Sequence, residues 1–229
     1  MSDRTVIAGR SPVRLEGTLD PDVSPALWLV KWLLLIPHLI ALAFLWFMFW
    51  LLTIVAFFAI LITGYYPRPI FDLNLGVMRW SWRVGFYGYS ALGTDRYPPF
   101  TLGEAPDYPA RLYIEYPEEK LSRGLVLVKW WLLAIPHYMV LALFLGTGGY
   151  GRDYGNGYVG WYSYTGLILL LVLFAAVAVL FTRRYPPGIF DFVMGMDRWV
   201  TRVIAYVSLM TDVYPPFRLD QGGTEIERD

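Results

Sequence analysis

The sequence has two histidines, and each follows a proline within a long apolar run. They are His38 and His137. An ionisable side chain near the middle of a membrane segment is a candidate for handling protons or ions. The alternative is structural, because a proline frees the carbonyl four residues earlier, and the kink then needs a polar neighbour. Those carbonyls belong to Leu33 and Leu132.

A lysine precedes each histidine, Lys31 by seven residues and Lys129 by eight. On a regular helix the extra residue rotates one side chain by about 100° relative to the other. A cooperative Lys–His site would not survive that shift unless a bulge absorbed it, so a structural kink is favoured over a proton relay. Each lysine lies about one turn inside its helix. This predicts an ammonium that extends to the cytoplasmic interface, or that contacts a lipid phosphate or a partner.

A stripe of arginines is the strongest candidate for a binding site. Five residues recur at offsets 0, 4, 7, 11 and 15: Asp72, Gly76, Arg79, Arg83 and Tyr87, and again Asp191, Gly195, Arg198, Arg202 and Tyr206. At about 100° per residue they share an arc of about 80°, which predicts an amphipathic helix. In one interpretation the arginines bind phospholipid head groups, and Trp80, Trp82 and Trp199 fix the depth. In the other, Asp72 and Asp191 join an internal network with the arginines. The two are compatible.

The sequence lacks the signatures of most catalytic sites. Without cysteine there are no disulfides, thiolate zinc sites or iron–sulfur clusters. No nucleophile elbow, Walker loop, HExxH motif or dinucleotide fingerprint is present. The formal net charge is zero, which gives no indication of a nucleic-acid partner. We expect neither an enzyme nor a bound cofactor or metal.

Composition favours a membrane protein. Hydrophobic residues make up 56% and charged residues 17%, against roughly 45–50% and 25% in ordinary globular domains. The ten tryptophans and seventeen tyrosines belong to the types enriched at membrane–water interfaces.

The chain is a tandem duplication. WLVKWLLLIPH at 28–38 recurs as VLVKWWLLAIPH at 126–137, and IFDLNLGVMRWSWRV at 70–84 recurs as IFDFVMGMDRWVTRV at 189–203. TDRYPPFTL at 94–102 likewise recurs as TDVYPPFRL at 211–219. The order is the same in both halves, so residues 1–107 and 108–229 are read as two repeats.

We expect an all-α integral membrane fold, in which each repeat has a transmembrane hairpin and an interfacial amphipathic helix. In the first repeat the hairpin is predicted at about 26–63, and its turn is placed near 44–50 because the Gly/Tyr-rich stretch splits the second copy of the run at the corresponding place. The amphipathic helix is predicted at about 70–92 and the YPPF segment at 97–100. In the second repeat the spans are predicted at about 124–145 and 165–182, the amphipathic helix at about 189–210 and YPPF at 214–217. The Gly/Tyr-rich stretch 146–164 is predicted to be an outer loop. The YPPF segments and residues 111–116 are expected to be extended, pairing as small strands on the cytoplasmic side.

Basic residues lie mostly at the bases of these hairpins. By the positive-inside rule, the bases and both termini face the cytoplasm of a multi-pass plasma-membrane protein. The repeated VKW…IPH, IFD…RW…RV and TDxYPPF motifs resemble a bacterial membrane family known as domain of unknown function 4389, covering both repeats. The resemblance implies a two-span hairpin followed by a helix, often duplicated. It implies no activity.

Two functions fit these features. The first is a non-enzymatic accessory or scaffolding subunit that packs against a larger membrane complex and binds phospholipid at its cytoplasmic face. The second is a small transporter or lipid-handling protein with a path between its two halves, lined by His38 and His137.

Overall fold

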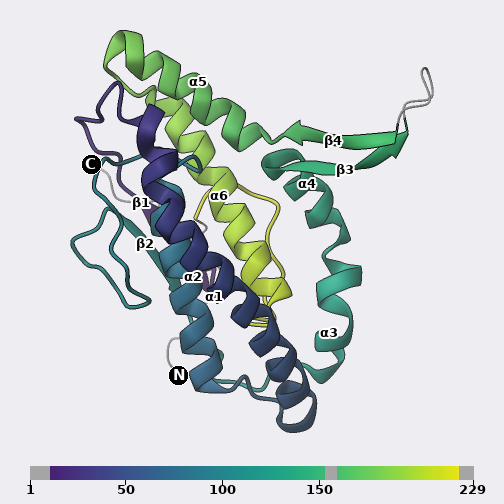
Figure 1. Cartoon of the computed structure of the whole chain (residues 1–229). Helices are drawn as coiled ribbons and strands as arrows, with labels where there is room; N and C mark the ends of the chain where they lie inside the picture. The colour runs from purple at the N-terminus through teal and green to yellow at the C-terminus, as the bar shows by residue number, and fades with distance from the viewer. Residues whose placement is uncertain (1–10, 153–158, 222–229) are drawn as a thin grey trace, which may run out of the picture.

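The computed structural model describes residues 11–152 and 159–221, and within them the chain is mostly helical (Figure 1). The helices are α1 (Trp28–Thr63), α2 (Arg68–Tyr87), α3 (Arg123–Val128), the π-helical turn η1 (Lys129–Leu133), α4 (Ile135–Leu145), α5 (Leu167–Thr182) and α6 (Pro187–Val207). Two antiparallel pairs of strands accompany them: β1 (Val13–Gly17) with β2 (Ala110–Ile114), and β3 (Gly146–Arg152) with β4 (Val159–Thr165).

The apolar run of the first repeat is one continuous helix. The prediction of a hairpin at 26–63 was wrong, because α1 runs without a break through 44–50. The helix ends before Gly64, which has a φ of 84° and donates its N–H to the Ile60 carbonyl. The run holds no glycine, and its only proline, Pro37, stays within the helix, so nothing in it favours a turn. The buried positions are Lys31, Leu35, His38, Leu42, Phe49, Thr53, Ala56 and Ile60. They form one narrow face.

In the second repeat the corresponding helix is interrupted by a β-hairpin. Pro67 and Pro186 occupy equivalent positions in the two repeats. Pro67 follows His38 by 29 residues, whereas Pro186 follows His137 by 49. The difference of 20 residues is the length of the segment from Gly146 to Thr165, which contains β3, β4 and their connection. The expected outer loop at 146–164 is therefore largely paired strand, and residues 153–158 lie outside the described part. Gly146 and Gly166 bring the two helix ends together, and a Cβ on Gly166 would lie 2.3 Å from the Leu145 carbonyl carbon.

A second irregularity absorbs the extra residue between lysine and histidine. Lys129–Leu133 form a π-helical turn, which accommodates one more residue than an α-helical turn. The helix bends by 45° just after it, between Leu133 and Ile135. The bulge restores the phase, so that Lys129 and His137 are buried like Lys31 and His38.

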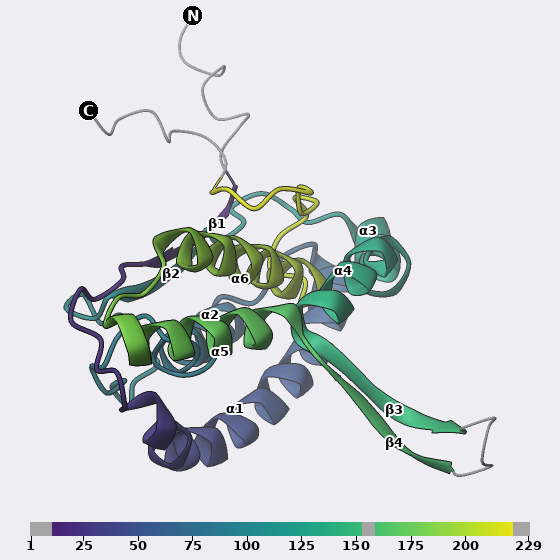
Figure 2. The ribbon, with the colours of Figure 1, turned by 90° about the horizontal axis from the view of Figure 1, so that it is seen from above.

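The amphipathic helices α2 and α6 form close to the predicted positions. Strands β1 and β2, one from each repeat, cross over them: β1 contacts α6, and β2 contacts α2. Figure 2 shows β1 and β2 on one side of α2 and α6, and α1 on the other. The predicted strand near 111–116 is β2, but it pairs with β1; the YPPF segments are not strands.

The strand pairing reveals a twofold relation between the repeats. In the repeated sequence, SPVRL at 11–15 corresponds to YPARL at 108–112, so Leu15 and Leu112 are equivalent. These two residues pair with each other in the β1–β2 ladder. A pseudo-twofold axis therefore passes through this pair, perpendicular to the strands. The arginines follow the same axis: Arg79 donates to the Leu112 carbonyl at 3.0 Å, and its equivalent, Arg198, donates to the Leu15 carbonyl at 3.4 Å.

One described helix, α1, is long and apolar enough to cross a membrane, and α3–α4 form a second candidate if the bent pair counts as one span. In α1 only 22% of the most apolar 18-residue window is buried within the chain. Its remaining surface carries exposed Leu, Ile, Val, Phe and Trp side chains.

Deleting Gly146–Thr165 tests whether the hairpin is an insertion. The deletion joins Leu145 to Gly166 in the helical phase of α1, so we expect a folded protein with a melting temperature within a few degrees of the original. A matched deletion of Thr147–Tyr164 leaves two extra residues, which rotate α5 by about 200°. Circular dichroism melting should show this control to be markedly less stable; equal loss in both variants would mean that the hairpin is part of the core.

Candidate functional site: two equivalent polar clusters

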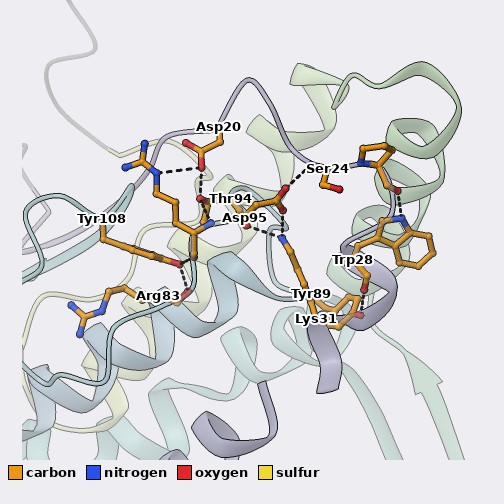
Figure 3. A network of polar contacts seen from close by, with 11 residues as sticks. Asp20, Ser24, Trp28, Lys31, Arg83, Tyr89, Thr94, Asp95 and Tyr108 are labelled. Atoms are coloured by element: carbon orange, nitrogen blue, oxygen red, sulfur yellow. Dashed lines mark hydrogen bonds and ion pairs between the residues drawn. The ribbon is translucent and has the colours of Figure 1, made fainter. Parts of the chain in front are cut away.

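The Lys31 ammonium is buried in a polar cluster at the start of α1 (Figure 3). It lies 2.9 Å from Asp95 Oδ1 and donates to the Thr94 carbonyl at 2.7 Å. The other oxygen of Asp95 accepts the Ser24 N–H at 2.5 Å, just before the helix. The Thr94 hydroxyl bonds to Asp20. One aspartate thus holds both the lysine and the chain that enters α1.

The second repeat builds the same cluster. Lys129 lies 2.8 Å from Asp212 Oδ1 and donates to the Thr211 carbonyl at 2.9 Å, and the Ser122 N–H donates to Asp212 Oδ2 at 2.6 Å. Both lysine side chains are fully buried. The expected ammonium extending to the interface is therefore not what the structure shows. Each ammonium has an aspartate partner within the protein, without which burial of the charge would be strongly unfavourable.

Each histidine lies in an aromatic enclosure. His38 stacks on Phe100 with ring centroids 3.8 Å apart, and Tyr97 lies 4.9 Å away. The equivalent contacts of His137 are with Phe217 at 4.5 Å and Tyr214 at 4.8 Å. Both imidazoles are buried.

A tryptophan fixes the protonation state of each histidine. The indole N–H of Trp80 donates to His38 Nδ1 at 3.0 Å, and that of Trp199 donates to His137 Nδ1 at 3.1 Å. Indole is only a donor, so Nδ1 must be an acceptor and the neutral ring carries its proton on Nε2. A charged imidazolium would set two N–H donors against each other. This geometry supports the structural interpretation of the histidines. The imidazoles, however, do not bind the carbonyls that precede the prolines. The hydroxyls of Tyr97 and Tyr214 donate to the carbonyls of Leu34 and Leu133 there.

The central arginines of the stripe face inward. Arg83 is 2% exposed and donates to the carbonyls of Gly103, at 2.9 Å, and Thr101. Arg202, also 2% exposed, donates to those of Arg218, at 3.0 Å, and Asp220. These carbonyls follow the two YPPF segments. Arg83 and Arg202 therefore form internal contacts, but their acceptors are backbone carbonyls and not Asp72 and Asp191, the partners that the second interpretation named.

The remaining residues of the predicted site lie elsewhere. Asp72 pairs with Arg68 at the exposed start of α2, and Asp191 is exposed at the start of α6. Arg79 pairs with Glu104 at 2.8 Å. Trp82 donates to the Glu16 carbonyl in β1 at 2.9 Å. Like Trp80 and Trp199, it anchors an internal contact.

The TDxYPPF motif joins these contacts, a role that was not predicted from the sequence. Its aspartate binds the lysine, its tyrosine and phenylalanine enclose the histidine, and the carbonyls after it bind the arginine. The signal was available, because the motif keeps the same internal spacing in both repeats. The segment is therefore a strap between the long apolar helix and the amphipathic helix.

One buried acid stands outside this symmetry. Asp197 on α6 occupies the position of Met78 on α2, and its Oδ2 has no hydrogen-bond partner among the described residues. Removal from water disfavours the charged form and raises the pKa of this carboxyl well above its ordinary value. No group of three or more potential metal ligands occurs within the described ranges.

Replacing Arg83 with Gln removes a buried guanidinium that donates to the Thr101 and Gly103 carbonyls. We expect the free energy of unfolding to fall by about 2–3 kcal/mol, measured by denaturation in detergent. Arg68→Gln is the control, since it removes an exposed ion pair with Asp72 and a cation–π contact with the Tyr116 ring, and should change stability by at most about 1 kcal/mol. Unchanged stability of Arg83→Gln together with loss of bound anionic lipid would restore the head-group interpretation.

Asp197→Asn should stabilise the protein in a pH-dependent manner. The unfolded carboxyl ionises near pH 4, whereas the folded one resists ionisation, so Asp197 lowers stability progressively as pH rises from about 4 toward its folded pKa. The Asn variant lacks this penalty. Its melting temperature should equal that of the parent below pH 4 and exceed it by a growing margin toward pH 7. A constant difference between pH 4 and 7 would contradict the assignment.

Comparison with known proteins gives a family and no activity. The family model described as "Domain of unknown function (DUF4389)" matches residues 25–101 and 158–218. No curated protein matches, and no solved structure matches. The first matched region contains α2 and the second contains α6, and each contains one TDxYPPF strap. Helices α3 and α4 and strand β3 lie outside both regions. The two regions cover more than half of the sequence, so the chain belongs to the DUF4389 family, as a tandem duplication of its domain.

Proposed function

We propose that the protein is a non-enzymatic accessory or scaffolding protein of the bacterial plasma membrane, with both termini on the cytoplasmic side. One observation carries the proposal: the lysines, histidines and central arginines point inward and are bound by aspartates, tryptophans and backbone carbonyls of the same chain, whereas the outer faces of the long helices are apolar. Lys31, His38 and Arg83 and their equivalents are all buried. Large apolar side chains are exposed along α1, α4 and α5.

Phospholipid is the first proposed partner. Arg83 and Arg202 donate to backbone carbonyls inside the protein, so the residues proposed to bind phospholipid head groups are basic residues at the surface. Arg68, Lys120, Arg123, Arg183 and Arg184 are exposed at the ends of the long helices. Exposed tryptophans, including Trp32, Trp50, Trp130 and Trp131, accompany the apolar surface. This combination is typical of proteins that bind anionic membranes.

The β3–β4 hairpin is the proposed contact with a larger membrane complex. It projects from the body (Figures 1 and 2), and α4 is the helix that it contacts most. A two-stranded hairpin on its own is marginally stable in water, and its free edges can pair with another strand. An added partner would supply the missing packing.

Purification from native membranes in mild detergent tests this proposal. We expect the full chain to elute in a complex larger than the monomer, and the variant lacking Gly146–Thr165 to elute as a monomer with bound lipid. Native mass spectrometry identifies both. The parent chain with Tyr164→Ser is the matched control for a change confined to one exposed hairpin side chain. A full chain that elutes as a monomer and moves a solute across liposomes would favour the transporter instead.

A further inference from the structure

We propose that the chain lies within one leaflet of the membrane, with α1 parallel to the membrane plane, rather than crossing the bilayer. The inference rests on the membrane location proposed above and replaces the expected transmembrane hairpins. It identifies the partner of the exposed apolar face as the acyl region of a single leaflet.

The twofold relation between the repeats gives the first argument. Local twofold axes of an antiparallel strand pair are perpendicular to its plane, so the axis through Leu15 and Leu112 passes from the β1–β2 layer toward the layer of α2 and α6. If this axis lies along the membrane normal, both repeats have the same depth and orientation. If it lies in the membrane plane, the β1–β2 pair sits level with the middle of the bilayer.

The contacts of α2 place the charged strands beside the middle of α1. Trp46, midway along α1, donates to the Ser81 hydroxyl on α2 at 2.9 Å. Two residues earlier on α2, Arg79 donates to the Leu112 carbonyl in β2. The neighbouring strand residues Arg14 and Arg111 are exposed. A spanning α1 would hold these guanidinium groups near mid-bilayer depth, at roughly 2.5–3.5 kcal/mol for each.

The exposed surface of α1 gives the second argument. Apolar side chains are exposed along its whole length, from Leu29 (51%) through Ile40 (70%) to Ile62 (75%). A helix of 36 residues is about 54 Å long, whereas the hydrocarbon core is about 30 Å thick. A helix parallel to the membrane can keep its full length in contact with lipid. Exposed charged residues occur at the helix ends but also on the strands beside the middle of α1, where Arg14 and Arg111 lie.

The connection between the repeats agrees with this orientation. The second repeat enters α3 beside the end of α1: the Leu121 N–H donates to the Gly64 carbonyl, and the Arg123 guanidinium donates to the Ile62 carbonyl, both at 2.8 Å. The first polar cluster therefore lies at the start of α1, and the equivalent cluster of the second repeat lies near its end. With α1 in the membrane plane, both straps and both clusters lie on the cytoplasmic side.

Nitroxide depth measurements test the orientation directly, because the chain has no cysteine of its own. Leu33, Ile40, Phe47, Ile54 and Phe58 lie on one outward face of α1 and are all exposed. Each is replaced in turn by a spin-labelled cysteine, and the full chain is reconstituted in vesicles of phosphatidylcholine and phosphatidylglycerol. Arg111→Cys on β2 is the water-facing control. Melting curves confirm folding, and Ile36 or Leu51 replaces any position that fails.

We expect the five labels to collide with oxygen to a similar extent and to report one depth within a few ångströms. A profile that deepens by about 15 Å toward Phe47 and becomes shallow again at both ends would show that α1 crosses the bilayer. That result would overturn the inference and leave the membrane location intact. Labels as accessible to a water-soluble relaxant as the one at position 111 would instead overturn the membrane location itself.

Discussion

The requirement that a buried ammonium have a partner organises each repeat. Lys31 and Lys129 have no exposed surface, and each depends on an aspartate more than 60 residues later in the chain. Satisfying that charge brings the TDxYPPF strap back onto the start of the long helix. Once there, the strap encloses the histidine and presents its following carbonyls to Arg83 or Arg202. The network therefore sets where the amphipathic helix lies against the apolar one.

Sequence reasoning recovered the parts of the fold that repeat or have a strong period. The duplication, helices α2 and α6, and the ends of the apolar segments of the second repeat follow from local patterns. The hairpin at 26–63 was inferred by analogy with the second repeat. That analogy failed because the glycine-rich stretch is an insertion into a helix and does not mark a turn common to both copies. The 38-residue stretch 26–63 is mostly apolar and lacks glycine, so it gives no internal evidence of a turn.

The candidate site was only half predictable, for a similar reason. Lys31, His38 and the arginines stand out because polar groups in apolar surroundings are rare. Their partners are harder to find, since most are main-chain carbonyls or residues of a strap far along the chain. The π-helical turn at Lys129–Leu133 shows how the two lysine–histidine spacings can serve one geometry. The extra residue would change the helical phase by about 100°, and the wider π-helical turn absorbs that change.

Within the described residues the β3–β4 hairpin occurs once, whereas the long helix, the amphipathic helix and the strap each occur in both repeats. A surface made only of the shared elements would offer two equivalent faces to its surroundings, related by the axis through Leu15 and Leu112. The insertion breaks that equivalence. Any partner that recognises the hairpin would meet one site per chain, so the stoichiometry of such an assembly would be one to one, and neighbouring molecules would have a defined direction relative to each other.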